Sequence, residues 1–322
     1  MESLEKTPST EPNKGKWLSV FITNLVATCL TLLGIYWIGS YGIALFILIP
    51  FFIGACSTIL YGRGRAITRR AASKIGFLTL GIFTAGLLFF AIEGIICIAM
   101  VAPIAVLLTW IGSLAGLAIL NKMPDNSTTP LLILVGIIPL TAFAENVQQP
   151  ELSAVTTSIE IDASPQTVWE NVIEFPPLED PEEFIFKTGI AYPINAKIDG
   201  KGVGAVRHCN FTTGSFVEPV TIWDEPHLLK FDVAEWPEPM KELSFWDVDA
   251  PHLHDYFVSK TGQFKLTALP NGKTLLEGTT WYSHNIRPAI YWQLWSEYIV
   301  HKIHKRVLNH IKVISESTDT KK

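Results

Sequence analysis

The sequence predicts two structural parts: an all-α transmembrane region of four to five helices, and an α+β domain in which an antiparallel sheet surrounds a long C-terminal helix. Three observations lead to this fold class. Long uncharged apolar stretches dominate residues 1–145. Short segments of alternating polarity, separated by turn residues, follow over residues 155–284. Residues 288–315 then carry the apolar spacing of an amphipathic helix.

Charge divides the chain at the same place. Residues 1–150 contain nine Lys/Arg and six Asp/Glu, a net charge of +3, whereas residues 151–322 contain sixteen and twenty-four, a net charge of −8. So acidic a domain lacks the basic surface that meets nucleic-acid phosphates, and we expect no nucleic-acid partner. The expected parts are a cytoplasmic tail (1–16), a transmembrane region (17–145), a linker (146–152), a folded domain (153–315) and a polar tail (316–322).

The expected spans follow from apolar stretches of about 20 residues. Residues 17–39 and 41–61 supply two spans joined by a tight hairpin at GSYG, and residues 75–120 have the length of two more. Glu93 lies within this last stretch, where we expect a hairpin end, although an ionisable residue in an apolar segment is also a functional candidate. A fifth segment, residues 130–144, has only fifteen residues, and Pro139 is expected to disturb a helix there.

The basic loop between the second and third spans determines the expected orientation. It contains Arg63, Arg65, Arg69, Arg70 and Lys74, so it is expected in the cytoplasm together with the N-terminal tail. If the fifth segment spans, the acidic domain lies on the outer, extracytoplasmic face, which is our prediction. If the segment lies in the membrane interface, the domain is cytoplasmic. The segment also resembles a signal peptide with a cleavage site after Ala144, which would release the domain.

The elements of the C-terminal half can be predicted in order. Residues 155–162 alternate as a strand, and Ser164 before Pro165 begins a helix whose apolar side includes Val168, Trp169 and Val172. GKGVG at 200–204 precedes a strand and indicates a turn, and PNGK at 270–273 is a hairpin signal. Further strands are expected near 203–211, 215–223, 228–234, 256–268 and 274–284, followed by the terminal helix.

This order resembles that of a helix-grip fold. The opening segment SIEIDASPQTVWENV resembles the entry motif of the SRPBCC superfamily, the START-like group of polyketide cyclase, dehydrase and lipid-transport domains, with matches at Ile159, Ile161, Ala163, Pro165, Val168 and Trp169. GKGVGAVRHCNF, PHLLKFDV and GKTLLEGTTW are similar to its sheet segments. The resemblance covers about residues 153–315 and implies a curved sheet enclosing an apolar cavity. The family includes carriers, enzymes and regulators, so the fold does not select a function.

Charged residues within the apolar strands are the best candidates for a site. Arg207, Glu218 and Glu277 need no explanation on a solvent face, and alternation alone does not assign the face. Any that point inward would need a partner, for which an Arg–Glu pair across the sheet is the natural arrangement. Such a pair would fix the polar end of a ligand in an apolar pocket. Cys209 and Trp281 are further candidates for the cavity lining.

The terminal helix contributes the remaining candidates. Its second half has an apolar side that includes His304, which is either a hydrogen-bonded core residue or a ligand-facing group. Its first half carries Tyr291, Trp295 and Tyr298, either as ordinary core or as an aromatic wall for a ligand. The histidines His252, His254, His301 and His304 are a weak alternative for a zinc site, since no sequence feature brings them together.

The expected function is membrane-tethered binding of a hydrophobic, lipid-like ligand in the helix-grip cavity, for transfer or sensing. The expected partners are therefore this ligand and the membrane, and we expect no cofactor or metal. One alternative is a cyclase- or dehydrase-type enzyme using Arg207, Glu218, Glu277 or His304, although its catalytic residues remain unknown. Another is a structural or sensor protein whose own aromatic residues fill the pocket. We find no nucleophile elbow, dinucleotide fingerprint, P-loop or metal motif in the sequence, which favours binding over catalysis.

Overall fold

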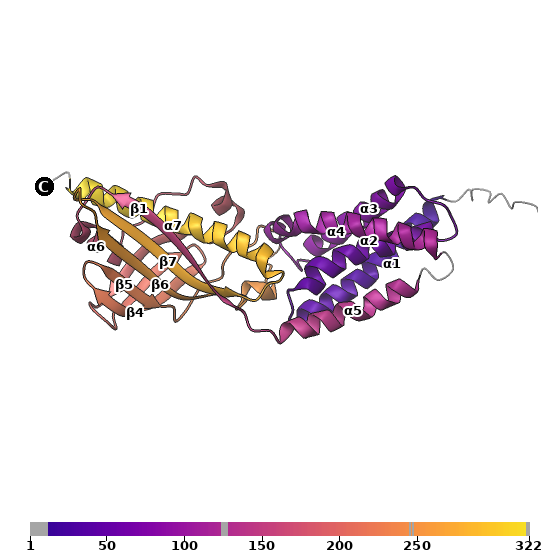
Figure 1. The fold of residues 1–322 in the computed structure, drawn as a ribbon, viewed down its shortest axis with the longest axis horizontal. Coiled ribbons are helices and arrows are strands. Elements are labelled where there is room, and N and C mark those ends of the chain that lie inside the picture. The colour runs from indigo at the N-terminus through magenta and orange to yellow at the C-terminus, as the bar shows by residue number, and fades with distance from the viewer. Residues whose placement is uncertain (1–11, 124–127, 245, 247, 320–322) are drawn as a thin grey trace, which may run out of the picture. The chain divides into compact units, whose positions relative to one another are not determined.

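The structure, a computed structural model, describes residues 12–123, 128–244, 246 and 248–319. Most of the expected N-terminal tail, part of the loop before the fifth apolar segment and the last three residues lie outside this description. The chain forms two compact units (Figure 1). The first comprises Met1–Gln148, Ser244–Pro251 and Ile286–Pro288, and the second Gln149–Leu243, His252–Asn285 and Ala289–Lys322.

The first unit is helical. Its elements are α1 (Pro12–Leu32), the π-helical segments η1 (Leu33–Ile38) and η2 (Ala44–Leu48), α2 (Ile49–Gly62), α3 (Arg69–Phe89), α4 (Ile95–Lys122) and α5 (Thr129–Asn146). Among the described residues, five helices are long and apolar enough to cross a membrane: Gly15–Ile38, Ala44–Gly62, Arg69–Phe89, Ile95–Lys122 and Thr129–Asn146. The fifth apolar segment is thus a full helical candidate. It runs through Pro139, which corrects the expected disturbance, because proline removes only one backbone donor.

The turns between these helices lie where the sequence indicated. Gly39 adopts a left-handed conformation (φ 72°) and ends the first span at the predicted GSYG hairpin. Glu93 lies between the end of α3 and the start of α4, which confirms the expected hairpin end. The helices α2 and α4 approach closely through glycines, because a Cβ atom at Gly54 or Gly112 would collide with a backbone carbonyl of the opposite helix.

The second unit has the helix-grip architecture. Its helical elements are α6 (Pro165–Ile173), the 3₁₀ segments η3 (Phe184–Thr188) and η4 (Pro251–Leu253), and α7 (Ala289–Asp319). The first residue of η4, Pro251, belongs to the first unit. Its strands are β1 (Leu152–Ile161), β2 (Pro193–Asp199), β3 (Val206–Phe211), β4 (Gly214–Asp224), β5 (Leu228–Asp232), β6 (Phe257–Ala268) and β7 (Thr274–His284). They form one antiparallel sheet in the order β1-β7-β6-β5-β4-β3-β2, and α7 lies along the sheet (Figure 1).

Local sequence signals explain most of these elements. The Ser164 hydroxyl accepts a hydrogen bond from the Thr167 N–H (3.3 Å) and caps α6, whose first residue is Pro165. In the turn between β2 and β3, Gly200, Gly202 and Gly204 all have positive φ angles near 90°, a conformation that side chains other than glycine rarely adopt. The strand β2 was not predicted, because it is short, begins with a proline and follows a proline-rich acidic stretch.

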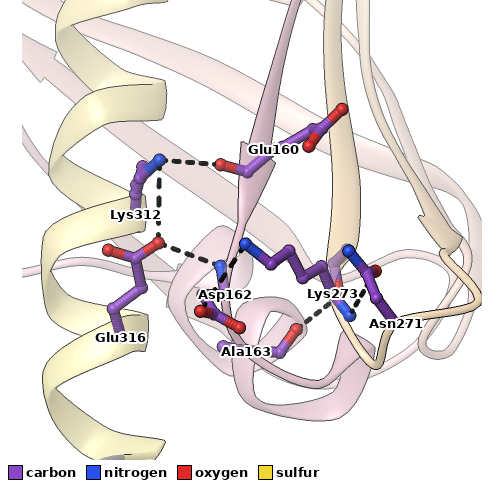
Figure 2. Close-up of polar contacts among 8 residues, drawn as sticks. Glu160, Asp162, Ala163, Asn271, Lys273, Lys312 and Glu316 are labelled. Carbon is purple, nitrogen blue, oxygen red and sulfur yellow. Dashed lines mark hydrogen bonds and ion pairs between the residues drawn. The ribbon is translucent and has the colours of Figure 1, made fainter.

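The core of the second unit lies between the sheet and the helices α6 and α7. Buried side chains from several strands meet the apolar side of α7, where Val307, Leu308 and Ile311 are buried as the helical wheel predicts. At one end of α7, polar contacts hold its last turns to the sheet (Figure 2). The Lys312 ammonium donates to the Glu160 carbonyl (2.9 Å), and the Glu316 carboxylate accepts from the Asp162 N–H (2.9 Å).

Candidate ligand-binding site on the inner face of the sheet

The strand register places two charged side chains side by side on the inner face of the sheet. Arg207 on β3 lies directly opposite Glu218 on β4, and the two form an ion pair through Arg207 Nη1 and Glu218 Oε2. Both residues are buried, with exposed fractions of 1% and 6%. The structure therefore shows the Arg–Glu pairing that burial of either charge would require.

The Arg207 guanidinium is enclosed by apolar and aromatic groups. Its Nε donates to the carbonyl of Ile173 at the end of α6 (3.1 Å). Three phenylalanine rings surround it, with centroids 5.7 Å (Phe175), 5.5 Å (Phe231) and 5.5 Å (Phe264) from Cζ. These distances permit cation–π attraction, which strengthens where water is excluded. One cation thus lies in an aromatic cage inside the core.

Burial and mutual attraction set the protonation of this group. Burial is the largest single influence and works against the charge of Arg207, but the neighbouring groups, chiefly Glu218, together outweigh burial and keep the pKa of Arg207 above its ordinary value. Burial raises the pKa of Glu218, and the Arg207 guanidinium acts against that rise. Cys209 lies two residues along β3, and burial together with the nearby Glu218 charge raises its pKa to about 12. Cys209 is therefore a neutral thiol beside a charge pair, and an unreactive one.

A second polar group on the inner face joins α7 to β1 and β7. The Thr157 hydroxyl lies 2.7 Å from His301 Nδ1 and 3.1 Å from His304 Nδ1, and the Thr280 hydroxyl lies 2.8 Å from His304 Nε2. Burial, with a smaller contribution from His301, lowers the pKa of His304 to about 4. His304 is therefore neutral at pH 7, and both of its ring nitrogens are hydrogen-bonded to threonines.

Two other candidates lie on the opposite face of the sheet. Successive side chains of a strand alternate between faces, and Tyr282 of β7 points into the core, so Trp281 and Glu277 point outward. Glu277 pairs with Lys265 of β6 at the surface (3.6 Å), and the Lys230 ammonium lies 5.4 Å from the Trp281 ring centroid. The structure does not bring these two residues together with Arg207 and Glu218.

The aromatic candidates of α7 have different surroundings. Tyr291 is partly buried and packs edge-on against Trp292 (5.6 Å), and Trp295 is also partly buried. Tyr298 is 47% exposed, and the Lys302 ammonium lies 5.9 Å from its ring centroid. Tyr298 therefore belongs at least in part to the outer side of the helix.

The four histidines of the zinc alternative do not converge within the described part of the chain. No three of them place ligand atoms within 4.8 Å of one another among the described residues. His301 and His304 share the Thr157 hydroxyl, whereas His254 Nδ1 lies 3.8 Å from Glu238 Oε1.

Sequence reasoning missed the residues that enclose the site. The cage rings of Phe175, Phe231 and Phe264 were not singled out, although Phe231 and Phe264 occupy inward positions in alternating strands. Thr157 and Thr280 were missed because a threonine in a strand is ordinary. Knowing which face of the sheet α7 covers would have revealed both threonines, but alternation does not contain that information.

Comparisons with known proteins concern the second unit. No family model and no curated protein matches the sequence. The C-terminal half matches solved structures at low sequence identity. A point mutant of norcoclaurine synthase from Thalictrum flavum, solved with a transition-state analogue, is 12% identical (TM-score 0.35) over 53% of this chain and 99% of that chain.

Two further matches have similar extent. A protein from Nitrosospira multiformis is 18% identical, with a TM-score of 0.34, over 52% of this chain and 99% of that one. The Aha1 dimer from Colwellia psychrerythraea is 17% identical, with a TM-score of 0.29, over 51% and 96%. Such low identities carry no functional argument. The helix-grip architecture rests on the strand order and the terminal helix, and this fold occurs in ligand-binding proteins and in enzymes.

Proposed function

We propose that this protein is a membrane-tethered binding protein for a hydrophobic, lipid-like ligand, whose polar group is held by Arg207 and Glu218. The buried ion pair in its aromatic cage carries the proposal. A buried pair is a poor stabiliser, because the desolvation of two charges offsets their attraction. A polar group on a ligand that enters the apolar interior would use the hydrogen-bond donors and acceptors that such a pair supplies.

The chemistry of the pair suits a small polar group on an apolar body. Arg207 supplies N–H donors and Glu218 supplies carboxylate acceptors. A ligand hydroxyl could accept from the first and donate to the second, while the phenylalanine rings contact the hydrocarbon. Few polar groups among many apolar ones is the usual composition of a small-molecule site.

The helical unit supports a lipid-like ligand in particular. Its five candidate spans would hold the helix-grip domain beside a bilayer, which raises the effective concentration of any ligand dissolved there. No observation favours a catalytic role in the same way. Both nitrogens of His304 are engaged by threonines, and the Cys209 thiol is held neutral.

The test is mass spectrometry of lipids that remain bound to the purified full chain. We expect one lipid class to be enriched over the bulk extract, and to be lost in the pair-replacing variant Arg207→Met/Glu218→Leu. The matched control is Lys265→Met/Glu277→Leu, which removes the surface ion pair on the other face of the sheet. Equal retention of the lipid by both double variants would refute a role for the buried pair.

We also propose that the helix-grip domain lies on the extracytoplasmic face. The carboxylate of Glu145, near the end of α5, accepts hydrogen bonds from the Ile43 N–H (2.7 Å) and the Ala44 N–H (3.3 Å), at the hairpin between the first two spans. At the other end of the bundle, Leu120 of α4 lies against Gly62, next to the basic loop. This arrangement supports an α5 that runs from the basic-loop side to the hairpin side.

The length of α5 is compatible with that path. Eighteen residues extend about 27 Å at about 1.5 Å per residue, slightly less than the roughly 30 Å hydrocarbon core. Glu145 also has a structural role that explains its burial, because a carboxylate is stabilised by the free N–H groups at a helix start. Gly42 is required beside it, since a Cβ atom there would collide with the Glu145 carboxylate.

Labelling with a membrane-impermeant thiol reagent tests the orientation. With the native cysteines replaced, a cysteine at Ser317 should be labelled in cells whose cytoplasmic membrane is intact. The matched control is Ala66→Cys in the basic loop, which should be labelled only after that membrane is broken. Labelling of the two positions under the same condition would contradict the proposed orientation.

A further inference from the structure

The first turns of α7 carry a line of exposed apolar side chains that neither the core nor the proposed ligand site uses. Ile290, Leu294 and Tyr298 are 81%, 64% and 47% exposed. Their spacing of four residues places them on one side of the helix, which we call the α7 stripe. Trp292 and Val300, on the other side of the same turns, are buried. The stripe is therefore a separate outer surface, and not a loosely packed part of the core.

The register of the sheet shows at which end of the domain the stripe lies. Leu152, the first residue of β1, pairs with Ser283 near the end of β7, and α7 begins a few residues later at Ala289. The start of α7 therefore lies at the end of the sheet where the chain enters the domain. The last turns of α7 lie at the opposite end, where Lys312 and Glu316 contact Glu160 and Asp162 (Figure 2).

Chain length limits how far this end can be from a membrane. The candidate span α5 ends at Asn146 and β1 begins at Leu152, so five residues connect them. The six Cα-to-Cα steps from Asn146 to Leu152 reach at most about 22 Å when fully extended. The limit follows from covalent geometry alone. The end of the domain that carries the α7 stripe is thus tethered within about 22 Å of the end of a candidate membrane span.

The chemistry of the stripe matches a bilayer interface. Two aliphatic side chains are followed by a tyrosine, a residue enriched at the headgroup level because its ring is apolar and its hydroxyl polar. One turn further from the tethered end, Lys302 lies against the Tyr298 ring (5.9 Å). A lysine at this position extends its ammonium toward lipid phosphates while its methylenes cover apolar surface.

We propose that the α7 stripe docks on the lipid surface, with Ile290 and Leu294 at the boundary between acyl chains and headgroups and Lys302 at the phosphates. The occupant of this surface is the bilayer itself. Residues 151–322 have a net charge of −8, so attraction of the whole domain to anionic lipid does not drive the contact. Apolar burial drives it, and zwitterionic phosphatidylcholine suffices.

The test measures lipid contact along α7 in the intact protein. In the full chain with its four cysteines replaced by alanine, Leu294→Cys carries an environment-sensitive fluorophore, and the protein is reconstituted in phosphatidylcholine vesicles. Phosphatidylcholine with spin-labelled acyl chains should quench this fluorophore at least about twofold. The matched control is Val313→Cys, which is 66% exposed on the C-terminal half of the same helix and should be quenched little.

Two results would overturn the proposal. Equal quenching at positions 294 and 313 would mean that the stripe has no special contact with lipid. The second result is a fluorophore at position 294 that is shielded at a high ratio of protein to lipid and becomes exposed as this ratio is lowered. It would identify a second copy of the chain, and not the bilayer, as the occupant of the stripe. Neither result depends on the Arg207–Glu218 pair, so failure here and failure of the proposed ligand site are distinguishable.

Discussion

Removal of the Arg207 guanidinium provides the sharpest test of the electrostatics of the core. In Arg207→Met the Glu218 carboxyl stays buried without its partner. An uncompensated buried charge costs about 3–5 kcal/mol, unless the group takes up a proton. For a carboxyl with an ordinary pKa of 4.5, protonation at pH 7 costs about 1.36 × 2.5, or about 3.4 kcal/mol. We therefore expect a loss of stability of about 3.4 kcal/mol at pH 7.

The pH dependence of this loss identifies its cause. In the variant the folded-state pKa of Glu218 lies above its unfolded value, so the folded state binds the extra proton and becomes relatively more stable as pH falls. At pH 5.5 protonation costs about 1.36 × 1.0, or about 1.4 kcal/mol. The difference between variant and parent should therefore shrink by about 2 kcal/mol between pH 7 and pH 5.5.

Cys209 is a built-in reporter for the measurement. Its thiol is buried and its pKa is raised to about 12, so a thiol reagent reaches it as a reactive group only when the domain opens. In the full chain with Cys29, Cys56 and Cys97 replaced, Cys209 labelling in Arg207→Met should exceed the parent about 300-fold at pH 7 and about tenfold at pH 5.5. Ratios taken at each pH cancel the intrinsic reactivity of the thiol.

The double variant Arg207→Met/Glu218→Leu is the control, because it replaces the pair by apolar groups instead of leaving one charge. It should label within about tenfold of the parent at both pH values, since apolar replacements of buried pairs are often neutral or stabilising. If Arg207→Met labels at the same ratio at pH 7 and 5.5, or if the double variant labels as fast as the single one, the assumed burial of Glu218 is wrong.

Three further predictions concern other parts of the helix-grip domain. The pKa of His304 is about 4 in the folded state and about 6.5 in the unfolded state. Neutral His304 therefore contributes to the free energy of unfolding above pH 6.5, and about 3.4 kcal/mol of this free energy is lost as pH falls to 4. Chemical denaturation of His304→Gln should show a smaller loss of stability over the same pH range. A parallel pH profile for both proteins would remove His304 as the cause. Residues 153–315, expressed alone, should be soluble and show one cooperative thermal transition, because they contain the whole sheet apart from the first residue of β1; aggregation would count against this boundary. Trp295→Ala should weaken the binding of an apolar fluorescent probe about tenfold while the circular dichroism spectrum persists, as the loss of one partly buried aromatic contact predicts. Unchanged affinity would assign Trp295 to the ordinary core.

Local patterns in the sequence were sufficient for most elements, because each depends on neighbouring residues. Four spans follow from the length of the apolar stretches, and Ser164 with Pro165 begins α6 because a hydroxyl cap and a fixed φ angle act within one helical turn. The hairpin at 270–273 needs only Gly272, whose φ of 78° suits the turn. By contrast β2 is recognisable only from its partner, since Pro193–Asp199 becomes a strand by pairing with β3.

Only the tertiary structure shows which face of the sheet the helices cover and which residues far apart in the sequence contact one another. The alternation of side chains along a strand places Arg207 and Cys209 on one face of β3, but the same pattern would be found if that face were exposed to solvent. The face is decided by α6 and α7, which cover one side of the sheet and leave Glu277 on the other. The threonines that engage His304 lie 147 and 24 residues away from it, and the carboxylate of Glu145 reaches N–H groups about 100 residues earlier. Such partners are chosen by where the chain folds back on itself, which no local pattern contains.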